Sequence, residues 1–167
     1  MYKYDTKAEK DYKIIANFKR PPKGIIIFDS FNNEWFPSKA IKIDNNQFNL
    51  RTLKDDFHRE FGGDSKNDLF MPFHYVVEFT GKDYYPTVQR PLTYKSLIPG
   101  YEDYISICVI GDSNSDIYPR NLYRIIAHTL LNPLHYIPGW KLNPKGNIIY
   151  HNLGEAFVER LLEKELR

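Results

Sequence analysis

The sequence predicts an α/β protein in which a mixed central β-sheet is flanked by helices. Three observations predict it: two short apolar runs typical of buried strands, an aromatic hairpin between them, and segments whose apolar residues recur at helical spacing. The expected order along the chain is strand, helix, hairpin, strand, helix, helix. A chain of 167 residues is long enough for one domain with a real core.

The first predicted strand lies in the stretch GIIIFDSF, residues 24–31. A glycine is followed by four apolar residues, and such a continuous run is typical of a strand that is buried on both faces. The run stops at Asp29 and Ser30, and a polar loop is expected over residues 31–49. A strand that ends in this way often delivers a functional side chain at its last positions.

Two further segments predict strands. Residues 74–90 are rich in β-branched and aromatic residues on either side of Gly81-Lys82-Asp83, which predicts a hairpin. Pro86 lacks a backbone N–H, so the second arm is expected at the edge of the sheet. Residues 103–113 form the clearest strand, and its apolar character on both faces predicts a central position.

Three helices are expected. The first covers residues 50–63 and ends at a pair of glycines, and the second covers 118–133 and ends at Asn-Pro. The last runs from about Leu153 to the C-terminus, where Asn152 and Glu155 resemble a capping box.

Composition limits the function classes. Hydrophobic residues make up 42% and charged residues 26%, as in soluble globular proteins, and no apolar run reaches the ~20 residues of a membrane helix. The first residues show no secretory signal. Cys108 is the single cysteine, so no intrachain disulfide can form, which suits a reducing compartment or a virion.

The charge is unevenly distributed. Residues 1–23 contain seven Lys or Arg residues against three acids, and Pro21-Pro22 separates them from the rest of the chain. We therefore expect a basic N-terminal arm, 1–23, and a single domain, 24–167. The arm is either a solvated tail, which we favour, or a segment that docks on an acidic partner. The net charge of +2 and the absence of a stacking motif argue against nucleic acid.

Familiar catalytic motifs are absent from the sequence. There is no Walker A loop, no GxGxxG, no CxxC, and no GxSxG around either Ser30 or Ser113. The five histidines form no HExxH pattern, and sequence alone brings no three of them together as zinc requires. Cys108 in mid-strand is expected to be a small buried hydrophobe.

Five segments nevertheless match a known pattern in the correct order: GIIIFDS, LRTLKDDFHREFGG, MPFHYVVEFTGKDYYPTVQRPL, GYEDYISICVIG, and PGWKLNPKG followed by YHNLGEAFVERL. Over residues 24–165 the chain resembles the zinc amidases of the phage lysozyme type, which share their fold with the peptidoglycan recognition proteins. The resemblance implies an amidase-like sheet. In that family, zinc assists cleavage of the bond between N-acetylmuramic acid and L-alanine.

The departures from the family pattern concern the metal. The resemblance puts the family's first zinc histidine at Phe28, the second at Gly139 or Trp140, and the third ligand at Asn147 or Tyr150. A tyrosine near the zinc falls on Phe73, and Lys145 keeps a residue type that phage members use there. Phenylalanine and glycine cannot bind zinc, and asparagine and tyrosine bind it poorly without imidazole or thiolate partners. No zinc or other cofactor is therefore expected.

In this interpretation the first strand delivers Phe28 as an apolar plug, followed by Asp29. We favour a loop or capping role for Asp29. The alternative is a rescued site in which Asp29 acts with His151 or His74.

Three functions are weighed. The first is a catalytically inactive, amidase-like protein that is encoded by a phage. It would bind a viral or host protein, or serve as a structural or assembly component of the virion. Its expected location is the host cytoplasm or the virion. The second is a peptidoglycan binder with a groove lined by Tyr75, Tyr84, Tyr85, Arg90 and Tyr94. The third is a divergent amidase that binds metal differently or uses none.

Overall fold

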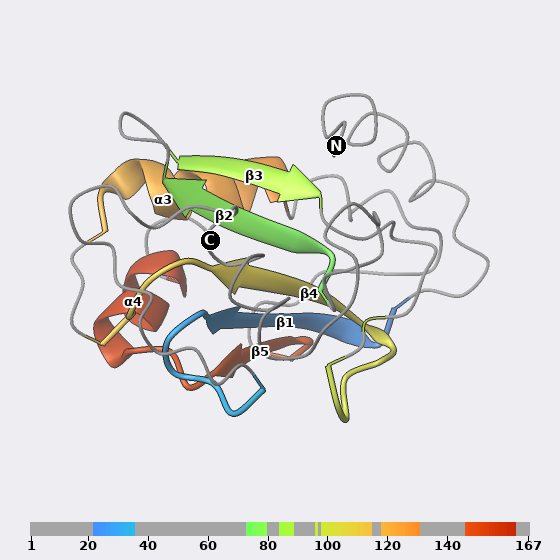
Figure 1. The fold of residues 1–167 in the computed structure, drawn as a ribbon. Coiled ribbons are helices and arrows are strands. Elements are labelled where there is room, and N and C mark those ends of the chain that lie inside the picture. Colours follow the sequence, from blue (N-terminus) through green and yellow to red (C-terminus); the bar gives the residue numbers. More distant parts are fainter. Residues whose placement is uncertain are drawn as a thin grey trace, which may run out of the picture.

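The computed structural model describes residues 22–35, 73–79, 84–88, 96, 98–114, 118–130 and 146–162, and Figure 1 shows their arrangement. The helix predicted at 50–63 lies outside the described residues. So do five of the predicted site residues: Arg90, Tyr94, Gly139, Trp140 and Lys145.

Five strands form one sheet in the order β3-β2-β4-β1-β5 (Figure 1). They are β1 (Gly24–Asp29), β2 (Tyr75–Phe79), β3 (Tyr84–Val88), β4 (Tyr104–Val109) and β5 (Ile148–His151). Strands β2, β4, β1 and β5 run parallel, and β3 pairs antiparallel with β2 at the edge. The predicted mixed sheet and hairpin are confirmed, and Pro86 lies on the edge strand, where its missing N–H breaks no central ladder.

The first predicted strand is confirmed as β1, which lies between β4 and β5. All its residues are buried, because Ile25 and Ile27 pack on one face of the sheet while Ile26 and Phe28 pack on the other. Strand β4 lies between β2 and β1, so its predicted central position is also confirmed.

The predicted order of elements was wrong in one respect, because it lacks strand β5 between the last two helices. Its four residues, IIYH, are too few to show a period, and a turn at residues 146–147 precedes them. Their extended conformation depends on the parallel pairing of Ile148 through His151 with Ile25 through Phe28, a partner more than a hundred residues away.

The second helix begins as α3 (Arg120–Arg124) and continues as the π-helix η1 (Ile125–Leu130), and the last is α4 (Glu155–Arg160). Pro119 is the N-cap of α3, in an extended conformation. These helices cover one face of the sheet (Figure 1). The core there joins Leu122, Tyr123, Ile126, Phe157 and Leu161 to side chains of β1, β2 and β4.

The predicted capping box at the last helix is wrong. The N-cap of α4 is Gly154, with no side-chain capping hydrogen bond, and Asn152 has a left-handed φ of 52°. A Cβ on Gly154 would collide with the backbone oxygen of Ser113. The start of α4 is therefore set by close packing against the loop after β4, which a local sequence pattern does not contain.

The second face of the sheet carries its own apolar cluster. It contains Ile26, Phe28, Phe73, Val76, Ile98, Cys108 and Ile110, with half-buried Trp35, Tyr101, Tyr104 and Ile149 packed against it. Cys108 is buried in mid-strand as expected, and burial raises the pKa of its thiol well above the ordinary value.

The first described residues lie at the predicted end of the basic arm. Pro22 is buried, and the Lys23 N–H donates to the backbone oxygen of Asp103 at 2.9 Å. The last two residues of the predicted arm thus belong to the folded unit. Among the described helices, none has the length and apolar character to cross a bilayer.

Candidate functional site

The carboxyl ends of three parallel strands meet at one edge of the sheet. The register pairs Asp29 at the end of β1 with Val109 of β4, and Phe28 with His151 at the end of β5. Ligands of open α/β sheets commonly bind outside the carboxyl ends of the strands. This edge is therefore the candidate functional site.

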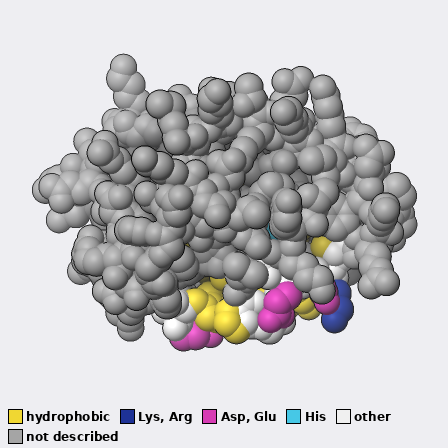
Figure 2. All heavy atoms as spheres, turned by 45° about the vertical axis from the view of Figure 1, so that its right-hand side comes forward, with side chains coloured by type: hydrophobic (Ala, Val, Ile, Leu, Met, Phe, Trp, Pro, Cys, Tyr) yellow, Lys and Arg dark blue, Asp and Glu magenta, His cyan; other side chains and the backbone are white. Residues whose placement is uncertain are grey.

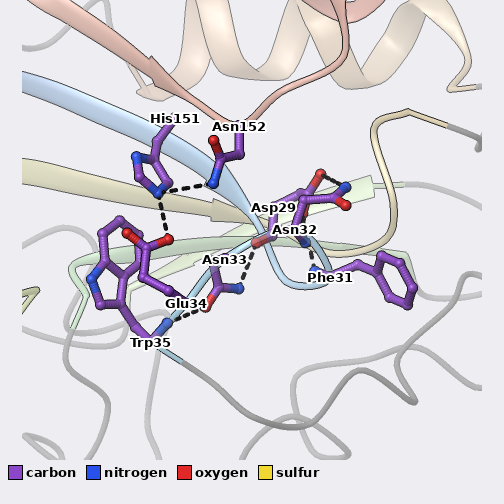
Figure 3. A network of polar contacts seen from close by, with 8 residues as sticks. All are labelled: Asp29, Phe31, Asn32, Asn33, Glu34, Trp35, His151 and Asn152. Carbon is purple, nitrogen blue, oxygen red and sulfur yellow. Dashed lines mark hydrogen bonds and ion pairs between the residues drawn. The ribbon is translucent and has the colours of Figure 1, made fainter.

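Asp29 organises the loops at this edge. Its carboxylate is fully buried and accepts hydrogen bonds from the backbone N–H groups of Phe31, at 3.0 Å, and Asn32 (Figure 3). It also accepts from the N–H and the hydroxyl of Ser113, at 2.9 and 2.6 Å. The favoured interpretation of Asp29 as a loop-capping residue is confirmed, because its oxygens are used to hold the backbone.

Further hydrogen bonds join the loops after β1, β4 and β5. The Asn32 amide nitrogen donates to Oδ2 of Asp29 at 2.8 Å and to Oδ1 of Asp112 at 2.6 Å. The Gly154 N–H donates to the Ser113 hydroxyl oxygen at 2.9 Å. The three loops thus form one connected network of buried and half-buried polar groups.

A second group lies beside this network. His151 Nε2 is 2.8 Å from Oε2 of Glu34, and the imidazole stacks on Trp35 with ring centroids 4.4 Å apart (Figure 3). The hydrogen bond from His151 holds the pKa of Glu34 below its ordinary value. Because Glu34 is then a carboxylate, Nε2 donates to it, and the Asn152 amide 3.3 Å away is a secondary contact.

Phe28 and Phe73, which the resemblance assigns to a zinc ligand and a nearby tyrosine, lie together. The Phe28 ring is fully buried and makes edge-on contacts with Trp35, at a centroid distance of 5.2 Å, and with Phe73, at 5.8 Å. Phe73 is also fully buried. The position assigned to the first zinc histidine is thus occupied by a packed aromatic cluster.

The two described candidates for the third ligand do not converge on Phe28. Tyr150 packs on the helix-covered face, whereas Phe28 faces the other way. Burial raises the pKa of Tyr150 to about 12, so its phenol keeps its proton at neutral pH. Asn147 lies at the other end of β1, where its backbone oxygen accepts from the Ile25 N–H, about 10 Å along the strand from Phe28.

The rescued sites are not assembled either. His74 Nδ1 accepts from the Ser106 N–H at 3.1 Å, and Ser106 is level with Ile26, about 10 Å along the strands from Asp29. His151 leaves β5 on the face of Phe28 and is held by Glu34. No group of three or more His, Cys, Asp or Glu residues suited to a metal occurs in the described part of the chain. The described positions that the resemblance assigns to zinc ligands, Phe28, Asn147 and Tyr150, therefore do not form a zinc site.

The structure does not bring the residues of the predicted peptidoglycan groove together among the described residues. Tyr75 is only 1% exposed and packs in the helix-covered core, so it cannot line a groove. Tyr84 and Tyr85 belong to edge strand β3, and their side chains lie outside the described part. Arg90 and Tyr94 lie outside the described residues altogether.

An open polar cavity of about 550 Å³ lies at the carboxyl edge. Among the described residues, its polar lining consists of Asn32, Asn33, Glu34, Asn114 and Asn152, and Phe31 and Leu153 supply the apolar part. We call this the polar cavity. It is absent from the sequence-based predictions, although one signal was present: FDSFNN ends one buried strand, GDSN follows another, and the ends of parallel strands share one edge.

No protein-family model, curated protein or solved structure matches this chain.

Proposed function

We propose that this chain is a catalytically inactive, amidase-like protein, phage-encoded, that acts by binding a viral or host protein or as a component of virion assembly. The observation that supports this most is the state of Phe28. Its fully buried ring, packed by Trp35 and Phe73, stands where the resemblance places the first zinc histidine.

The chemistry of the family needs a donor set that Phe28 and its neighbours do not offer. Zinc would polarise the scissile amide and activate water. A phenyl ring has no lone pair to give a metal, and the imidazole nearest in register, His151, is engaged with Glu34 and Trp35. A metal ion could bind here only if the buried rings moved apart, and loss of their packing would cost free energy of folding. This supports loss of the metal centre over a site that is merely waiting for metal.

A scaffold that has lost its chemistry can persist because it still binds. The loops at the carboxyl edge are held by Asp29, Ser113 and Asn32, while the polar cavity beside them is open. Rigid loops lose little entropy when a partner docks on them. This supports recognition of another macromolecule over catalysis.

The test is a zinc-supplemented peptidoglycan assay with the purified chain. We expect no new L-alanine amino termini and no co-sedimentation with insoluble peptidoglycan, with an active zinc amidase as positive control. Release of L-alanine termini would show a divergent amidase and reject the proposal. Saturable co-sedimentation without release would favour the peptidoglycan-binding alternative instead.

A further inference from the structure

We infer that the polar cavity binds the guanidinium group of an arginine side chain on a partner protein. This inference rests on the proposed function, because it names the chemistry by which a protein partner would be recognised. The volume of the polar cavity is suitable, because about 550 Å³ falls within the roughly 300–1,000 Å³ of ordinary ligand sites.

The hydrogen-bonding polarity of the lining favours a donor ligand. The Asn32 amide nitrogen lies between carboxylate oxygens of Asp29 and Asp112, at 2.8 and 2.6 Å. The reverse orientation would set its oxygen against two carboxylates, so the orientation is determined and the carbonyl oxygen points away from them. The Asn33 amide is engaged on both sides, since its nitrogen donates to the backbone oxygen of Asp29 at 2.9 Å and its oxygen accepts from the Trp35 N–H at 3.0 Å.

The charge of the lining favours a cation. The Glu34 side chain is 58% exposed, and its carboxylate, which accepts from His151 and from its own backbone N–H, has about four acceptor positions in all. Asp112 lies directly behind Asn32 with little exposure. Among the described residues that line the polar cavity, none is a lysine or an arginine.

The shape of the acceptors favours arginine over lysine. Guanidinium is planar and carries five N–H donors in a fixed fork, which suits acceptors held on separate loops, whereas ammonium is a compact and strongly hydrated charge. Phe31 and Leu153 supply apolar lining against which the methylene stem of an arginine can pack.

The experiment titrates the ¹⁵N-labelled full chain with N-acetyl-arginine amide and follows the side-chain NH₂ signals of Asn32, Asn33, Asn114 and Asn152. We expect saturable shifts at these four residues. The citrulline analogue, which has the same shape without the charge, should bind at least about tenfold more weakly. Equal binding of citrulline, tighter binding of the lysine analogue, or saturable shifts only elsewhere would overturn the inference.

Two matched variants sharpen the titration. Glu34→Gln should weaken the arginine probe by about tenfold, because one charge-assisted contact is lost. Glu159→Gln, on the exposed side of α4 and outside the cavity lining, should leave the affinity unchanged. The unshifted remainder of each spectrum verifies that the variant is folded.

The outcomes separate the two proposals. An active, zinc-binding chain that still binds the arginine probe would reject the proposed function alone. A metal-free, inactive chain without saturable shifts would reject this inference alone.

Discussion

At the level of single residues, Phe28 is the position whose substitution is expected to change stability most. Its ring is fully buried between Trp35 and Phe73. Phe28→Ala should lower the free energy of unfolding by about 3–5 kcal/mol, through lost transfer energy and the cavity left behind. Urea denaturation measures this. Phe31→Ala, at a half-buried position, should lower the free energy of unfolding clearly less. A near-zero effect of Phe28→Ala would mean that the Phe28 ring does not contribute to the packed core.

Glu34 gives a pH prediction. Its pKa is lowered chiefly by the hydrogen bond from His151, with a smaller charge effect from the same ring. The contribution of this pair to stability is therefore present above the ordinary carboxyl range and is lost as the pH falls through the lowered pKa. In a carboxyl NMR titration, His151→Ala should move the Glu34 midpoint up toward 4.5, while Asn152→Ala should leave it in place. An unchanged midpoint in His151→Ala would contradict the assignment.

Residue roles were predictable where local context decides them. The buried thiol of Cys108 and the capping role of Asp29 both follow from their positions within and at the end of an apolar run. Tyr75 was assigned to a surface groove and is core instead. Its burial depends on helices that pack over β2 from distant parts of the chain, and a hairpin pattern carries no information on which side they lie.

At the scale of elements, the strands with continuous apolar runs were predicted well, and β5 and the start of α4 were not. Strand β5 forms because β1 offers it a parallel partner. The start of α4 is set by contact between Gly154 and Ser113 rather than by an N-cap side chain. Both depend on pairing across the fold.

Gly154→Ala tests the second of these contacts. The added methyl group would collide with the Ser113 backbone oxygen, so the variant should lose about 1–3 kcal/mol of unfolding free energy, as in other overpacked sites. Thermal denaturation followed by circular dichroism measures the loss. Glu155→Ala, at the exposed neighbouring position, should change stability by less than about 0.5 kcal/mol. Equal stability of the two variants would refute the close approach.

At the scale of the whole molecule, two apolar clusters sandwich one mixed sheet, and the polar loops gather at its carboxyl edge. In the view of Figure 2, hydrophobic and acidic side chains of the described residues lie side by side at the surface, while basic ones appear only at one end. The fold class followed from the apolar runs and helical periods. The polar cavity did not, because it is made by three loops that only the strand order brings together.

The basic arm gives a prediction at this scale. Pro22 is buried and Lys23 is hydrogen-bonded to Asp103, and we expect deletion of residues 1–20 to leave cooperative unfolding intact. The denaturation midpoint and slope of the shortened chain should match those of the full chain. A loss of cooperativity would show that the arm belongs to the core.

The proposed loss of a metal centre at Phe28 and its aromatic neighbours can be tested on the purified chain. The most direct measurement is the zinc content of the purified chain after incubation with excess zinc and dialysis, by inductively coupled plasma mass spectrometry. We expect far less than one equivalent of zinc, equal to the content of a Phe28→Leu variant. One equivalent per chain that survives dialysis would contradict the proposed loss.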